Sequence, residues 1–85
     1  MVNVTMRQLR YFDALARHGH FGRAAEASSI SQPALSMQIK EMEEALGGPL
    51  LERSARQVTL TRFGEELAGR VRDILRSVDE LSDFA

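Results

Sequence analysis

The chain has 85 residues, a formal net charge of −1 at pH 7, a hydrophobic fraction of 44% and no cysteine. This length suits one small domain with a marginal core, and the lack of cysteine excludes disulfide bonds and thiolate metal sites. No apolar run approaches the roughly 20 residues that span a bilayer, and the first ten residues lack the apolar core of a signal peptide, so we expect a soluble, cytoplasmic protein.

The charges are unevenly distributed along the chain. Residues 1–40 carry five Lys and Arg side chains against two acids, whereas residues 41–85 carry six arginines against ten acids. The small net charge is unlike the basic composition of most DNA-binding domains. The segregation nevertheless allows one basic side on the folded molecule.

Two helices are predicted in the first thirty residues. Thr5 followed three residues later by Gln8 has the pattern of a capping box. Apolar residues then recur every three or four positions until Gly19 ends the pattern, which predicts a helix over 6–18. A second, short and alanine-rich helix is predicted over 23–28, where small side chains allow another helix to approach closely.

The third predicted helix begins in a polar, uncharged stretch. Ser31 is a favourable N-cap, and Pro33 lies in the first turn, where its missing N–H removes no intrahelical hydrogen bond. Gly47 and the two residues after it end the helix near residue 46. Apolar residues spaced four, three and four apart form its buried face: Leu35, Ile39, Met42 and Leu46.

Two short apolar runs and a long amphipathic helix complete the chain. Residues 50–52 and 57–60 flank a turn and predict a two-stranded β-hairpin, which needs support from the helices. Thr61 can cap a last helix over 62–84, whose apolar residues follow a heptad pattern. The predicted dimer-interface residues are Leu67, Val71, Ile74, Leu75, Val78 and Leu81.

This order of elements predicts a mostly α, winged helix-turn-helix fold: three helices and a two-stranded β-wing, followed by a long linker helix that mediates dimerisation. The predicted domains are a DNA-binding domain over 1–61 and a dimerisation helix over 62–85. A helix-turn-helix presents the N-terminal end of its second helix to the major groove of DNA. We therefore expect residues 32–46 to form the recognition helix.

The outward face of this helix carries groups that read base edges. Glutamine pairs with adenine through one donor and one acceptor, serine matches several bases, and proline and methionine contact the thymine methyl group. The predicted base-reading residues are Gln32, Pro33, Ser36 and Met37. Phosphates, which set the register, attract cations, hydroxyls and helix N-termini. The predicted phosphate-binding residues are Arg23, Ser31, Gln38, Lys40, Arg53 and Arg56.

Other functions compete with DNA binding. The uncharged stretch 29–39 also suits a docking face for a protein partner, and a steep salt dependence distinguishes DNA from such a partner. His18, His20 and Glu26 are poorly spaced for a metal site, and no serine has a nearby base-and-acid set. We therefore expect no catalytic residue, no metal and no cofactor. The glutamates within 41–44 are expected to form a solvated helix face.

Several motifs resemble the N-terminal domain of LysR-type transcriptional regulators, over about residues 6–84. They are F-x-R-A-A-E at 21–26, S-Q-P-A-L-S at 31–36, Q-I-K-x-M-E at 38–43 and L-L-E-R…V-x-L-T-x-x-G at 50–64. The resemblance implies that base reading falls on Gln32, Pro33 and Ser36, and that the wing arginines are Arg53 and Arg56.

Three positions depart from this resemblance. Gly22 stands where many family members have threonine, which removes a hydroxyl contact to phosphate. Met37 stands where many have arginine, which removes a cation at the edge of the groove. Phe63 stands where alanine is usual, next to Gly64, and is expected to pack at the dimer interface. These departures concern individual contacts and leave the predicted fold unchanged.

The resemblance also implies partners. Members of the family bind interrupted palindromes in promoters, as dimers joined through the long helix and often as tetramers, and they sense a small molecule with a C-terminal domain. We therefore expect double-stranded DNA as the ligand and a homodimer through 62–84. For the full-length protein we expect a dimer or tetramer, with an effector-binding domain that this chain lacks.

Overall fold

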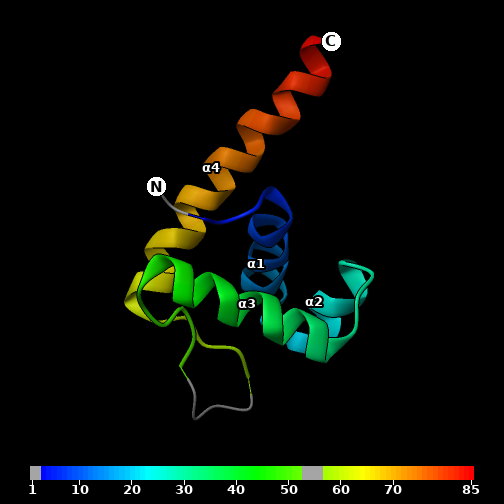
Figure 1. Cartoon of the computed structure of the whole chain (residues 1–85). Helices are drawn as coiled ribbons and strands as arrows, with labels where there is room; N and C mark the ends of the chain where they lie inside the picture. Colours follow the sequence, from blue (N-terminus) through cyan, green and yellow to red (C-terminus); the bar gives the residue numbers. More distant parts are fainter. Residues whose placement is uncertain (1–2, 53–56) are drawn as a thin grey trace.

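The computed structural model describes residues 3–52 and 57–85, and these residues form four helices (Figure 1). The helices are α1 (Met6–His18), α2 (Phe21–Ala27), α3 (Gln32–Leu46) and α4 (Arg62–Phe84). The predicted bounds of the first and third helices are confirmed. α2 begins two residues earlier than predicted, because the Nδ1 atom of His20 accepts the backbone N–H of Arg23 and caps the helix. Within the two described ranges, no helix is long and apolar enough to cross a membrane.

Local caps define the ends of the longer helices. The side chains of Thr5, Ser31 and Thr61 each accept a backbone N–H from three residues further on, at 3.0–3.2 Å. α1 and α3 end at Gly19 and Gly47, whose φ angles of 65° and 82° lie in the left-handed region that glycine adopts without strain. These caps hold α3 in place at both ends, so its first turn is well defined.

The core forms around α1, which contacts α2, α3 and α4 (Figure 1). Each large apolar side chain that becomes fully buried contributes about 1.5–3 kcal/mol. α3 crosses α1 and uses one face for this packing, which leaves the rest of α3 available to solvent. The fully buried large side chains are Phe12, Leu15, Leu35, Ile39, Met42, Leu50 and Val71.

The predicted β-hairpin is wrong, because the described residues contain no β-strand. Leu51 and Leu60 form one isolated antiparallel bridge, next to a hydrogen bond from the Glu52 N–H to the Thr59 carbonyl. Consecutive side chains Leu50 and Leu51 are both buried, at 0% and 5% exposure, which does not fit the alternating faces of a strand. The fold observed in the described residues is therefore helical, without the two-stranded wing.

Two backbone donors of this segment have acceptors in other parts of the chain. The backbone N–H of Leu50 donates to the Glu43 carboxylate at 2.7 Å, and that of Val58 donates to the carbonyl of Gly19 at 3.3 Å. The Leu50 N–H is therefore not available to Thr61, whose own N–H donates to the Leu50 carbonyl at 3.0 Å. The predicted turn at 53–56 lies outside the described residues.

The hydrogen bond from Leu50 to Glu43 goes with a correction to the expected solvated face of α3, because Glu43 is buried. Glu43 is only 7% exposed, whereas Glu41 and Glu44 are exposed as predicted. A buried carboxylate is tolerated when it accepts hydrogen bonds, and the bond to Leu50 ties α3 to the segment that follows it.

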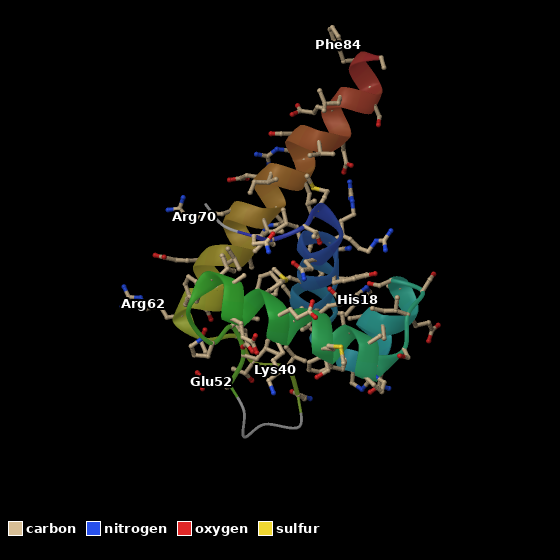
Figure 2. All side chains as sticks on the ribbon, viewed as in Figure 1. His18, Lys40, Glu52, Arg62, Arg70 and Phe84 are labelled. Carbon is tan, nitrogen blue, oxygen red and sulfur yellow. The ribbon has the colours of Figure 1, made fainter. Side chains whose placement is uncertain are left out.

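α4 belongs to the core along its first half and leaves it along its second half. Four residues spaced four, three and four apart are buried: Gly64, Ala68, Val71 and Leu75. Beyond them the helix extends out of the core, with an ion pair between Arg10 of α1 and Asp79 at 3.0 Å, and Phe84 lies near its free end (Figures 1 and 2). The packed core thus extends across the predicted boundary at residues 61 and 62.

Candidate nucleic-acid interface

Three exposed side chains follow one line along α3. Gln32, Ser36 and Lys40 are spaced four residues apart and all are exposed. Residues four apart lie on the same side of a helix, and the buried face of α3 holds Leu35 and Ile39 against the core. The line therefore begins at the capped N-terminus of α3 and continues along the helix on its solvent side.

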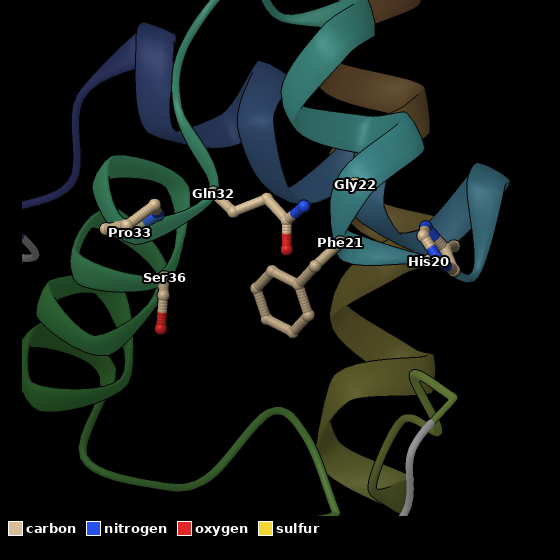
Figure 3. A pocket seen from close by; sticks show the side chains of 6 residues that line it. All are labelled: His20, Phe21, Gly22, Gln32, Pro33 and Ser36. Carbon is tan, nitrogen blue, oxygen red and sulfur yellow. The ribbon is translucent and has the colours of Figure 1, made fainter.

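An open hollow of about 720 Å³ lies where this line begins, between the first turns of α2 and α3. Figure 3 shows the side chains of Gln32, from α3, and Phe21, from α2, both directed into the space between the two helices, with Ser36 further along α3. No acidic side chain lines the hollow, so its walls do not repel an anionic ligand. The lining residues are His20, Phe21, Gly22, Gln32, Pro33 and Ser36.

The start of α3 offers two free donors. The Oγ atom of Ser31 accepts the N–H of Ala34 at 3.2 Å, so the hydroxyl hydrogen of Ser31 is left to donate elsewhere. Pro33 has no N–H, and the N–H of Gln32 has no intrahelical acceptor in the first turn. A hydroxyl and a backbone N–H at a helix N-terminus suit an anion such as phosphate.

Among the other predicted base-reading residues, Pro33 lines the hollow, whereas Met37 follows Ser36 on α3 and does not line it. The side chain of Met37 is exposed on the solvent-facing side of α3. Its flexible, apolar side chain suits a contact to a methyl group. The structure thus brings all four predicted base-reading residues to one exposed surface of α3.

Gln38 lies on the opposite flank of α3 from Ser36. A separation of two residues corresponds to about 200° around a helix axis, so Gln38 faces α1. There its Oε1 atom accepts the amide Nε2–H of buried Gln8 at 3.1 Å. The same Gln8 amide also donates to Glu41 at 3.3 Å. This network fastens α3 to α1 and points Gln38 away from the hollow.

The two described cations among the predicted phosphate contacts, Arg23 and Lys40, do not line the hollow. Lys40 is exposed one turn beyond Ser36 and projects toward the segment after α3 (Figure 2). Arg23 is exposed on another side of α2, beside His18 and Glu26. Arg53 and Arg56 lie outside the described residues.

Sequence reasoning missed the parts of the surface that α2 contributes. His20 and Phe21 line the hollow, yet histidine is not among the preferred N-cap residues, so the sequence offered no signal for its position. Within residues 3–52 and 57–85, no group of three or more His, Cys, Asp or Glu side chains could hold a metal ion.

The predicted dimer-interface residues of α4 fall into two adjacent rows. Val71 and Leu75 pack into the core of the chain itself, at 0% and 6% exposure. The other four form an outer row that is half-buried at Leu67 and Val78, and exposed at Ile74 (43%) and Leu81 (66%). We call these four residues the outer row of α4.

Comparison with known proteins gives the family. The sequence model described as "Bacterial regulatory helix-turn-helix protein, lysR family" matches residues 6–65, which is more than half of the chain. The chain belongs to the LysR family.

Individual relatives of this LysR-family chain are named as regulators of transcription. The SDS degradation transcriptional activation protein of a Pseudomonas species is 54% identical over 70 residues, which cover 82% of the chain and 23% of that protein. The chain therefore spans about a quarter of the length of this curated relative.

Solved structures of LysR-type proteins share the fold. The BenM DBD/catB site 1 DNA complex has a TM-score of 0.91 at 38% identity, covering 95% of this chain and 90% of that one. Vibrio fischeri DarR in complex with DNA has a TM-score of 0.87 at 29% identity, covering 96% of this chain and 30% of that one.

Proposed function

We propose that this chain binds double-stranded DNA sequence-specifically, as the DNA-reading part of a LysR-type transcriptional regulator, and that it acts by binding and not by catalysis. The observation that carries the proposal is the exposed, uncharged N-terminal end of α3, with its hollow free of acidic side chains. The BenM and DarR structures that share this fold are DNA complexes, which supports the assignment.

The dimensions of α3 match a major groove. A helix with its side chains is about 10–12 Å across, and the major groove of B-DNA is about 12 Å wide. In this arrangement Gln32 pairs with the edge of adenine and Ser36 with a neighbouring base. Pro33 and Met37 contact thymine methyl groups. These short or flexible groups reach base edges without requiring charge.

The phosphate contacts surround this reading surface. Ser31 and the N–H of Gln32 meet one phosphate at the start of α3, where the helix dipole also favours an anion. Lys40 meets a second phosphate along the same helix, and Arg23 a third from α2. Arg53 and Arg56 remain phosphate contacts predicted from the sequence. Gln38 is not among the proposed phosphate contacts, since it faces α1, where its amide oxygen accepts from Gln8.

We also propose a homodimer through α4, since the outer row of α4 is apolar and only partly covered in the single chain. α4 has 23 residues, and at 1.5 Å per residue it is about 35 Å long, so it reaches well beyond the rest of the fold. Covering Ile74 and Leu81 with a second copy removes apolar surface from water. Two copies present two recognition helices, which suits an interrupted palindromic site.

The test of base reading is selection from random DNA duplexes, repeated at several salt concentrations. Gln32→Ala is expected to relax one base position and weaken cognate binding by about 1–3 kcal/mol. Lys40→Ala is expected to weaken binding to all sequences alike and to reduce the salt slope by about 0.9.

Gln38→Ala is the matched control, a glutamine on the same helix that faces α1. It is expected to leave the base preference unchanged. A base preference that survives Gln32→Ala, or binding that barely responds to salt, would overturn the proposal and favour a docking face for a protein partner.

A further inference from the structure

Gly22 lies in the first turn of α2, between two side chains of the proposed DNA surface. A Cβ atom at this position would lie 2.8 Å from Cε1 of His20 and 3.2 Å from Nε2 of Gln32. Figure 3 shows Gly22 between these two side chains. A methyl group at residue 22 would therefore intrude into space that the two side chains now occupy.

The backbone of Gly22 does not itself require glycine. The positive-φ glycines of the described chain are Gly19 and Gly47, and Gly22 lies inside a helix. Glycine is less favourable than alanine within a helix. What favours glycine at residue 22 is thus the crowding by the side chains of His20 and Gln32, and not the backbone conformation.

The two neighbours respond differently when that space is filled. The ring of His20 is held by its Nδ1 atom, which accepts the N–H of Arg23 at 3.2 Å and caps α2. Gln32 is exposed, and its amide is the end of a flexible side chain. A Cβ atom at residue 22 therefore forces the His20 ring to move, at the expense of the cap, and requires the Gln32 amide to shift by a few tenths of an ångström.

We propose that Gly22 is a specificity-determining position of the DNA surface, because the missing side chain provides the space in which the Gln32 amide lies. Filling that space redirects the amide and changes which base Gln32 prefers. The inference rests on the proposed function, since Gln32 must read a base for its direction to matter. Gly22 has no side chain with which to contact DNA, so its role is to leave space for the Gln32 amide.

The test is a double-mutant cycle between Gly22→Ala and Gln32→Ala, read by selection from random duplexes with the 85-residue chain. Gly22→Ala is expected to change the preference at the base position of Gln32 by about fivefold or more, the lower end of the range for one bidentate contact. In the Gln32→Ala background the same change is expected to have less than a twofold effect. Gly22→Ala combined with Lys40→Ala should be additive.

A second pair of variants separates Gln32 from His20. His20→Ser keeps an N-cap residue and removes the ring from the space beside Gly22. Gly22→Ala is still expected to change the base preference in this background, because Gln32 remains. Loss of the effect in His20→Ser would assign it to the ring and overturn the inference.

The outcomes distinguish this inference from the proposed function. If Gln32→Ala leaves the base preference unchanged, the proposed function fails and the inference fails with it. If Gln32→Ala relaxes one base position while Gly22→Ala changes nothing there, or acts equally with and without Gln32, only the role of Gly22 is overturned.

Discussion

Replacing Gly64 by alanine tests how closely the start of α4 lies against the segment that follows α3. A Cβ atom on Gly64 would overlap the carbonyl oxygen of Leu50 and lie 3.3 Å from Cβ of Leu60. The same carbonyl accepts the backbone N–H of Thr61 at 3.0 Å. Because the overlapping atom belongs to the backbone, it cannot swing aside as a side chain would.

The magnitude follows from two opposing effects. Alanine gains about 0.5–1 kcal/mol over glycine within a helix, while overpacking of this kind costs about 1–3 kcal/mol. Loss of the hydrogen bond from Thr61 to Leu50 would cost about 1 kcal/mol more. We expect Gly64→Ala to destabilise the protein by about 1–3 kcal/mol, which for a domain of this size lowers Tm by roughly 5–20 °C.

Gly69 in the same helix provides the control. A Cβ atom there would meet nothing closer than the Arg72 guanidinium at 3.9 Å, so Gly69→Ala should raise Tm by a few degrees, since helix propensity acts alone. Both variants are melted at one protein concentration, because the proposed dimerisation would make Tm depend on concentration. A Gly64→Ala protein that melts at or above the wild-type temperature would refute this packing.

Three further predictions concern a buried carboxylate, a cap and the outer row of α4. Glu43→Ala should lower the free energy of unfolding by about 1–3 kcal/mol in urea, since it leaves a buried N–H without its acceptor. Glu44→Ala should change it by less than about 0.5 kcal/mol, and equal effects would contradict the burial of Glu43. Ser31→Asp should keep the cap and the Tm but weaken DNA binding by anisotropy, because it sets a negative charge against a phosphate; unchanged affinity would remove Ser31 from the interface. Ile74→Asp with Leu81→Asp should sediment as a folded monomer, and a persistent dimer would exclude the outer row as its interface.

The helix bounds illustrate what local sequence can predict. A cap such as Ser31 acts on an N–H three residues away, and Gly47 ends α3 through its own φ angle. These interactions lie within one turn of the chain, so the sequence pattern predicts α1 and α3 with correct ends. The exposure of Gln32 and Ser36 also follows from the 3.6-residue period of the helix, because these residues lie on the face opposite the buried apolar residues.

The segment after α3 shows where local patterns fail. Its apolar runs have strand-like composition, but the backbone N–H of Leu50 donates to the Glu43 side chain on α3. A backbone N–H that has found such a partner is not available to a ladder. Composition contains no information about which distant acceptor a donor will meet.

The sequence by itself determined the helices, their caps and the polar character of the α3 surface, because each depends on residues within a few positions of one another. Tertiary structure decided which apolar residues of α4 entered the core, since Val71 and Ile74 both belong to the predicted heptad pattern and only packing against the other helices buries Val71 and leaves Ile74 exposed. It also turned Gln38 toward Gln8 and brought Gly22 beside Gln32. Contacts of this kind depend on how whole helices cross, which the order of residues along any one helix does not specify.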